Sequence, residues 1–255
     1  IEESISKKLS QPFRALEYIS SMFSPKLQIA LYFVIIALFL AIFLLYDIRM
    51  NEICFSIEKF TYIKKTSENN GFNINEKIGF LPKLLKRRLN SYDRKVVYLI
   101  NEAFDESVET IFFSSRYGEF QRLKELISEY QEYNEVSPSA FSASVHNFPV
   151  GFYSMFKKID IPTNSLSAGE NSFSEGLLCA LLNDKNIITF CANNEEDYVS
   201  FKINKNKVED NNKNFKLIKS SNNKNSINEI DEFIDFILND EKEILFNSFK
   251  LEATR

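Results

Sequence analysis

The hydrophobic and polar positions of the chain divide it into two regions of different character. Ile29–Tyr46 is an uncharged run that is apolar on every face. A helix that crosses a bilayer needs about 20 apolar residues, so this run predicts one helix of transmembrane length within residues 27–46. A buried core helix is the alternative interpretation. We therefore expect residues 1–49 to form an N-terminal extension and residues 50–255 to form a separate domain.

The sequence leaves the origin of the extension open. Ile1 is not an initiator methionine, whereas Met50 directly precedes the segment that reads as an independent domain. Residues 1–49 are either a native membrane anchor or an extension from an upstream reading frame. Basic residues lie on both sides of the apolar run, so the charge distribution does not fix the orientation of a membrane helix.

Strand-like and helix-like patterns alternate after residue 50. Alternation and short apolar runs predict strands at residues 51–63, 108–114, 163–168, 187–191, 199–203, 215–218 and 243–251. Helical spacing predicts helices at residues 91–103, 117–133, 171–182 and 227–238, with further helical turns inside 78–90 and 136–156. Ser91 is the expected N-cap of the first of these helices. This alternation predicts an α/β layered domain.

Two polar segments are expected to be loops. Residues 67–77 are rich in turn-forming side chains. The Asn/Lys-rich residues 204–214 are expected to form a long mobile hairpin between the strands that flank them.

Composition and charge exclude several classes of function. Hydrophobic residues make up 44% of the chain, which is enough for a globular core, and the net charge of −4 argues against a nucleic-acid-binding protein. Three scattered cysteines, Cys54, Cys179 and Cys191, suit a reducing compartment and neither a disulfide framework nor a zinc site. The single histidine, His146, excludes a mechanism that draws two histidines from this chain. With six glycines and no phosphate-binding motif, no cofactor or metal is expected.

Three short motifs are candidates for chemistry. Ser144 and His146 suggest a nucleophile and base, but side chains two residues apart on a helix do not face each other, so a hydrogen-bonded structural histidine is the stronger interpretation. Glu170 begins a predicted helix, where the helix dipole favours a carboxylate, and an ordinary first-turn glutamate is its alternative. The basic cluster Lys86, Arg87 and Arg88 is either a solvated face or a contact for an acidic partner.

The order of these motifs resembles the N-terminal half of a β-ketoacyl synthase, a condensing enzyme of the thiolase superfamily. The resemblance is to the half-size, ketoacyl-synthase-like chain-length factors of aryl polyene and related pathways in particular. The stretches that carry it are, in order, FLPKLLKRRLNSYDR, VETIFFSSRYGEF, SPSAFSASVHNFPVGFYSM and IPTNSLSAGENSFSEGLLCAL, followed by FKLIK with the final helix and strand. Ser137–Leu182 is the most specific part. It implies a layered, thiolase-like half as the fold. Ser144, His146 and Asn147 match one family motif, and Gly169 matches the glycine before the nucleophile.

The resemblance also implies that this chain does not condense acyl groups by itself. Glu170 stands where the acyl-accepting cysteine of an active enzyme is expected, and a carboxylate does not form the required thioester. The chain ends before the half that would carry the decarboxylating histidines, and His146 precedes the nucleophile position. Cys179 lies well beyond that position and is expected to be a small core residue. No catalytic residue is therefore assigned.

By the same resemblance, the chain is a partner of an active β-ketoacyl synthase in fatty acid or aryl polyene-type biosynthesis. Pairing is expected through the strand at 163–168, and an acyl carrier protein is expected at Lys86, Arg87 and Arg88. The acyl tunnel or the interface would be lined by large side chains, unless these belong to the core: Phe148, Phe152, Tyr153, Met155 and Phe156. The domain is expected in the cytosol, anchored to the inner membrane if residues 27–46 are native.

Two other functions stay open at this stage. The chain could be a membrane-anchored binding or scaffold protein with a degenerate thiolase fold and no role in chain length. A hydrolase that uses Ser144 and His146 is the third interpretation, and it predicts an esterase activity that depends on Ser144.

Overall fold

The computed structural model describes residues 53–66, 71–206, 213–220 and 228–254, which all belong to one compact unit, Glu52–Arg255. The predicted apolar helix within residues 27–46 lies outside the described residues, as do residues 207–212 of the Asn/Lys-rich connection. Within the described part of the chain, no helix combines the length and the apolar character needed to cross a membrane.

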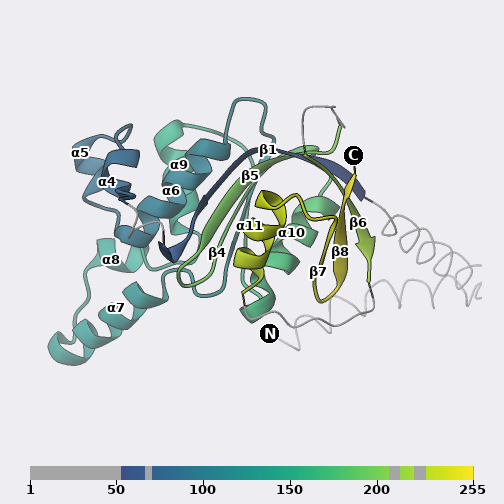
Figure 1. Ribbon diagram of the computed structural model, residues 1–255. Coiled ribbons are helices and arrows are strands. Elements are labelled where there is room, and N and C mark those ends of the chain that lie inside the picture. Colours follow the sequence, from purple (N-terminus) through teal and green to yellow (C-terminus); the bar gives the residue numbers. More distant parts are fainter. Residues whose placement is uncertain (1–52, 67–70, 207–212, 221–227, 255) are drawn as a thin grey trace, which may run out of the picture. The chain divides into compact units, whose positions relative to one another are not determined.

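An eight-stranded mixed sheet forms the centre of this unit, with the strand order β3-β2-β4-β5-β1-β6-β8-β7 (Figure 1). The strands are β1 Ile53–Ile63, β2 Thr110–Ser115, β3 Thr163–Leu166, β4 Ile187–Asn193, β5 Tyr198–Asn204, β6 Lys213–Lys219, β7 Glu243–Leu245 and β8 Phe249–Thr254. β2 runs parallel to β3 and β4, and the other neighbours are antiparallel. β3 and β7 are therefore the edges of this sheet.

Helices cover both faces of the sheet (Figure 1). They are α4 Ile74–Lys77, α5 Lys83–Lys86, α6 Ser91–Ala103, α7 Phe120–Tyr133, α8 Pro138–Ser142, α9 Phe148–Lys157, α10 Ser172–Leu182 and α11 Glu229–Leu238, with a 3₁₀ turn, η1, at Gly169–Asn171. Successive side chains of β2 point to opposite faces. Ile111 and Phe113 pack in the cluster with α6 and α9, whereas Phe112 packs in the cluster with α10 and α11. The predicted α/β layered fold is confirmed.

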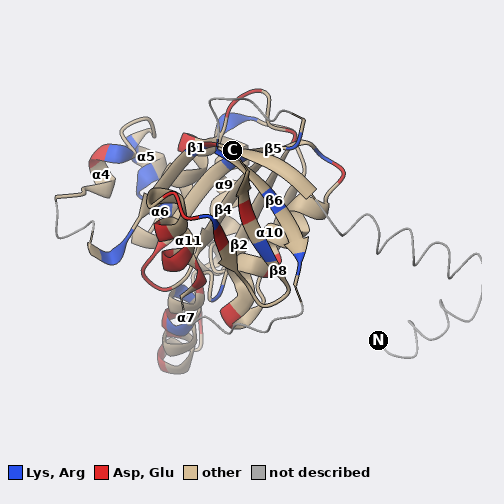
Figure 2. Ribbon diagram, turned by 45° about the vertical axis from the view of Figure 1, so that its right-hand side comes forward, with Lys and Arg blue, Asp and Glu red and all other residues tan. Residues whose placement is uncertain are grey.

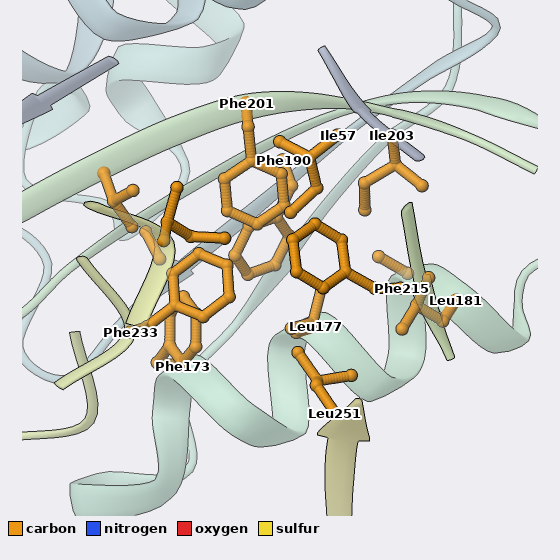
Figure 3. Packing of buried hydrophobic residues seen from close by; sticks show 14 of the residues in the cluster. Ile57, Phe173, Leu177, Leu181, Phe190, Phe201, Ile203, Phe215, Phe233 and Leu251 are labelled. Atoms are coloured by element: carbon orange, nitrogen blue, oxygen red, sulfur yellow. The ribbon is translucent and has the colours of Figure 1, made fainter. Parts of the chain in front are cut away.

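Aromatic side chains fill the core beneath α10 and α11 (Figure 3). The Phe173 and Phe233 ring centroids are 4.9 Å apart, and the Phe201 ring lies 5.3 Å from Phe233 and 5.2 Å from Phe190. Such ring pairs add to the free energy gained by burying their surfaces. The cluster fixes the first turn of α10 against the sheet, because Phe173 is the second residue of that helix.

Local capping explains where two of the helices begin. The Asn90 side chain accepts from the Asp93 amide, and Asp93 accepts from the Asn90 amide, so Asn90 closes a capping box on α6. The prediction that Ser91 is the N-cap is wrong by one residue. Pro149 lies in the first turn of α9, where its missing amide hydrogen is not needed.

The strand pairing differs from the prediction at the C-terminal side of the domain. β5 and β6 do not form a hairpin, because β1 lies between them and pairs with both. The strand expected over residues 243–251 is two antiparallel strands, β7 and β8. Residues 67–77 also contain a helical turn, α4, which the sequence pattern did not indicate. Local alternation of polar and apolar residues does not encode the pairing of distant segments, so the strand pairing could not be predicted from the sequence.

Candidate functional site

Glu170 lies in the turn that connects an edge strand to a central helix. Residues 167–171, called the β3–α10 turn below, leave the carboxyl end of β3 and enter α10 through the 3₁₀ turn η1. Gly169 has φ +62°, in the left-handed region that glycine adopts without steric cost. The Ser172 hydroxyl accepts from the Ala168 amide at 2.9 Å and donates to the Gly169 carbonyl at 2.7 Å, which closes the turn.

The Glu170 side chain is 63% exposed and points away from the core. One carboxylate oxygen lies 3.2 Å from Arg116 Nη2. The Arg116 carbonyl accepts from the Ser167 hydroxyl at 3.0 Å, so the loop after β2 is joined to the same turn. An exposed ion pair of this kind stabilises a fold by about 0–1 kcal/mol.

The cavity behind Glu170 is very small. Its volume is about 20 Å³, and it is lined by side chains from the β3–α10 turn, from α10, from the end of β4 and from α11, among them Glu170, Phe173, Asn193 and Glu229. A space of this size holds about one water molecule. An acyl chain has no room there.

A second carboxyl group lies at the beginning of α10. Glu229, from the first turn of α11, is 4% exposed and accepts from the Ser174 amide at 3.0 Å and from the Ser174 hydroxyl at 2.6 Å. Burial raises the pKa of Glu229, while the bonds from Ser174 act in the opposite direction. The first turn of α10 thus donates an amide hydrogen to the chain's own carboxyl group. This contact could not be predicted from the sequence because nothing local links residues 174 and 229.

Ser144 and His146 do not form a catalytic pair. They lie in the connection between α8 and α9, where the Ser144 hydroxyl donates to the Phe141 carbonyl at 2.8 Å. His146 Nε2 lies 3.1 Å from the Ser115 carbonyl, which requires the proton on Nε2, and its ring centroid is 5.4 Å from that of Phe113. The prediction of a hydrogen-bonded structural histidine is confirmed.

Two neighbours of His146 define its surroundings. Gly118 has φ +53°, and a Cβ atom there would come within 2.6 Å of His146 Cδ2, so only glycine fits. Asn147 precedes α9, is exposed, and forms no side-chain cap with that helix. The Ser-Val-His-Asn motif therefore holds the loops after β2 and α8 together.

The aromatic residues predicted to line a tunnel do not surround one cavity. Phe152 and Tyr153 are buried, and Tyr153 packs against Phe104 with ring centroids 5.7 Å apart. Phe156 packs against Phe80, whereas Met155 is 59% exposed. Phe148 alone among the five lines one of the described pockets. For Phe152 and Tyr153 the structure agrees with the alternative interpretation, a place in the core.

The basic cluster lies on the surface beside α5. Lys86 ends that helix, and Figure 2 shows the basic positions of α5 in blue. Arg87 and Arg88 are exposed, and their side chains have no partner among the described residues. Both line an open pocket of about 440 Å³, which also includes Arg122 from α7 and Phe148 from α9.

A buried cluster of charged side chains at the N-terminus of α7 was not predicted. Arg122 donates from Nη2 to the Asp93 carboxylate at 2.5 Å and from Nε to Glu119 at 3.0 Å. Asp93 is 0% and Glu119 3% exposed. Burial, with the adjacent Asp93 carboxyl, raises the pKa of Glu119 to about 9, so the two acids hold one proton at neutral pH.

The cysteines and possible metal ligands add no further site. Within the described ranges, no group of three or more metal-ligating side chains gathers. Cys191 is fully buried, and burial raises the pKa of its thiol. Cys179 is exposed on α10, so the expectation that it lies in the core is wrong. It lies on the face of the helix that is turned away from the sheet.

Comparison with known proteins agrees with this architecture of a layered α/β half with a strand–turn–helix connection at Glu170. The chain matches the family described as "Beta-ketoacyl synthase, N-terminal domain" over residues 63–197, just over half of its length. The chain therefore belongs to this family. No curated protein sequence matches it.

Among solved structures, the chain is similar to one described as "Ketosynthase (ApeO) in Complex with its Chain Length Factor (ApeC)" from Xenorhabdus doucetiae. The TM-score is 0.60 at 20% sequence identity, and the match covers 79% of this chain and 99% of that chain. At this identity the likeness establishes a shared fold, which is consistent with the expected thiolase-like half.

Proposed function

We propose that this chain is a non-catalytic, chain-length-factor-type partner of an active β-ketoacyl synthase in fatty acid or aryl polyene-type biosynthesis. The observation that carries the proposal is Glu170, a carboxylate in the β3–α10 turn of a ketosynthase-family domain. Transfer of an acyl group to such an enzyme requires a thiolate. A carboxylate is a weak nucleophile, and its acyl adduct is an anhydride that water hydrolyses.

The remaining thiols near the turn do not replace the missing nucleophile. Partial desolvation of the otherwise exposed Cys179, followed by the adjacent Glu175, raises the pKa of its thiol, so the thiol is protonated at neutral pH. Cys191 is enclosed by the core. The cavity of about 20 Å³ behind Glu170 also leaves no space for an extender unit.

The exposed edge of β3 supports a heterodimer. Its outer residues Thr163, Asn164 and Ser165 are exposed, and β2 is its only neighbour among the described strands. The Ile111 amide donates to the Pro162 carbonyl at 3.1 Å, and in a parallel ladder alternate residues bond to the same neighbour. The amides of Thr163 and Ser165 therefore face away from β2, toward a strand of a partner.

Within this proposal, the partner's tunnel ends against the surface beside β3, and an acidic carrier protein docks at Lys86, Arg87 and Arg88. The domain works in the cytosol, anchored to the inner membrane if residues 27–46 are native. Arg87 and Arg88 have no ion-pair partner in the part of the chain that the structure describes, which favours an acidic contact there.

The decisive experiment combines activity and co-purification. The purified chain, given malonyl and acyl groups on a carrier protein, is expected to release no condensation product. A tagged chain is expected to recover an active β-ketoacyl synthase in equal amount from its native organism, as identified by mass spectrometry. Condensation by the chain alone would contradict the proposal.

A variant of the edge strand tests the mode of pairing. Ser165→Pro removes an outward amide of β3 and leaves the bonds to β2 in place, so it is expected to abolish co-purification. Ser165→Ala keeps that amide and is the matched control. Recovery of the unaltered chain only as a membrane-bound monomer would favour the scaffold protein instead.

A further inference from the structure

The pocket beside α5, called the basic pocket below, combines arginine side chains that have no partner among the described residues with an apolar wall. It measures about 440 Å³ and lies between the end of α5, α7, α8 and the first turn of α9. Pockets that bind small molecules commonly have this size. It does not include any residue of the β3–α10 turn.

Three guanidinium groups line the basic pocket, against one carboxylate, Glu125. Arg122 forms part of the wall, and its side chain is 11% exposed. Its Nη2 and Nε atoms bond to Asp93 and Glu119, whereas Nη1 has no partner among the described residues. The side chains of Arg87 and Arg88 likewise have no partner within the described ranges.

The net charge differs between the wall of the pocket, at Arg122, and its rim, at Arg87 and Arg88, because only Arg122 is paired with buried carboxyl groups. The Arg122 charge is balanced by Asp93 and Glu119, which share one proton and therefore carry one negative charge between them. Arg87 and Arg88 are balanced only in part by Glu125. The rim thus has a surplus of positive charge, and guanidinium groups bind phosphate and carboxylate through paired N–H donors.

The opposite wall is apolar. It is formed by Leu89, Ala140, Ala143 and Phe148. The Arg122 guanidinium lies 5.3 Å from the Phe148 ring centroid, so the charged wall and the apolar wall adjoin. Alanine at positions 140 and 143 keeps this side of the pocket open, because a larger side chain would fill it.

We propose that the basic pocket binds a small amphiphilic anion, with a phosphate or carboxylate head at Arg87, Arg88 and Arg122 Nη1, and an apolar chain along Ala140, Ala143 and Phe148. The binding requires neither a ketosynthase nor a carrier protein. It can therefore hold or fail separately from the function proposed above.

Calorimetric titration of the full chain tests this site with four probes. Hexyl phosphate and hexanoate carry the two possible heads, inorganic phosphate lacks the chain, and hexylammonium reverses the charge. We expect saturable binding of one molecule of hexyl phosphate or hexanoate, and at least roughly tenfold weaker binding of inorganic phosphate and hexylammonium. The ratio of the first two affinities identifies the preferred head. Hexylammonium also controls for uptake by the uncharged run Ile29–Tyr46.

Two variants connect the binding to named side chains. R87Q/R88Q removes the rim charges and is expected to raise Kd by roughly tenfold or more, whereas K157Q/K158Q removes equal charge outside the pocket and is expected to leave Kd within about twofold. Ala140→Leu fills the apolar wall and should weaken hexyl phosphate more than inorganic phosphate. Positions 87, 88 and 140 are not buried, so all variants are expected to keep the fold, which circular dichroism checks.

The proposal is overturned by any of three results. These are the absence of saturable binding by both hexyl anions, equal binding of hexylammonium, and an unchanged Kd in R87Q/R88Q. Equal affinity for hexyl phosphate and inorganic phosphate would overturn the apolar half of the site.

Discussion

The β3–α10 turn and the basic pocket differ in the volume of open space that they enclose and in the sign of their exposed charges. Behind the turn, Phe173 and the buried Glu229 leave about 20 Å³. The basic pocket has about 440 Å³ and two arginines without protein partners in the described chain. The space behind the turn is thus filled by the chain's own side chains, and a larger open space lies beside α5.

The difference teaches that fold and chemistry are separable here. The strand, the left-handed glycine and the helix are all present at the turn, so the backbone geometry does not depend on a nucleophile. Burial of Phe173 and the bonds from Ser174 to Glu229 hold the segment behind the turn. Substitutions in the two regions should therefore change the free energy of unfolding by very different amounts.

The largest effect is expected from Phe173→Ala, which removes the side chain that fills the space behind the turn. Phe173 is 3% exposed, and its ring lies 4.9 Å from Phe233 and 5.7 Å from Phe246. We expect the free energy of unfolding to fall by about 3–5 kcal/mol, as in other buried Phe-to-Ala substitutions. Urea denaturation measures it, and Phe141→Ala, at a side chain that is 61% exposed, is the control. Equal losses in both variants would contradict the assignment of Phe173 to the core.

A pH-dependent effect of intermediate size is expected at the wall of the basic pocket. The pKa of Glu119 is raised from its usual 4.5 to about 9 by burial and by Asp93. Between these two values the folded state binds more protons than the unfolded state, so the free energy of unfolding falls as the pH rises. The slope from this group is at most about 1.4 kcal/mol per pH unit.

Glu119→Gln is expected to remove that slope, because an amide stays neutral throughout. Urea denaturation at pH 5.5, 7 and 8.5 provides the comparison, and the variant should be at least as stable as the unaltered chain at the highest pH. Glu132→Gln, at an exposed carboxyl on the same helix, should retain the slope. If the unaltered chain shows no decline over this range, the two buried acids do not share a proton.

The smallest effect is expected at Glu170 itself. Its side chain is 63% exposed and, among the residues that the structure describes, pairs with Arg116 alone, so Glu170→Ala should change the free energy of unfolding by less than about 1 kcal/mol. Glu170→Cys should likewise fold normally and still produce no condensation product, because the chain lacks a pair of histidines. A large loss of stability in Glu170→Ala would mean that the carboxylate has a structural role.

The sequence predicted the local elements well and the long-range contacts poorly. Helix 91–103 and the buried strand from Ile187 were correct because their apolar spacing is continuous. The turn at Glu170 was predicted by the change from strand-like to helix-like spacing around Gly169, and only its link to a nucleophile came from family resemblance. The contact between Glu229 and Ser174 escaped prediction, since it joins segments that only the folded chain brings together.

The position of β1 has a consequence for the order of events as the chain is made. Ser56 pairs with Asn204 on one side and with Asn214 on the other, so the first described strand cannot find either neighbour until most of the domain has left the ribosome. Contacts of such sequence separation slow folding. Nascent β1 thus presents unpaired edges until β5 and β6 have emerged, and its closure between them joins the two sides of the sheet before β7 and β8 are added.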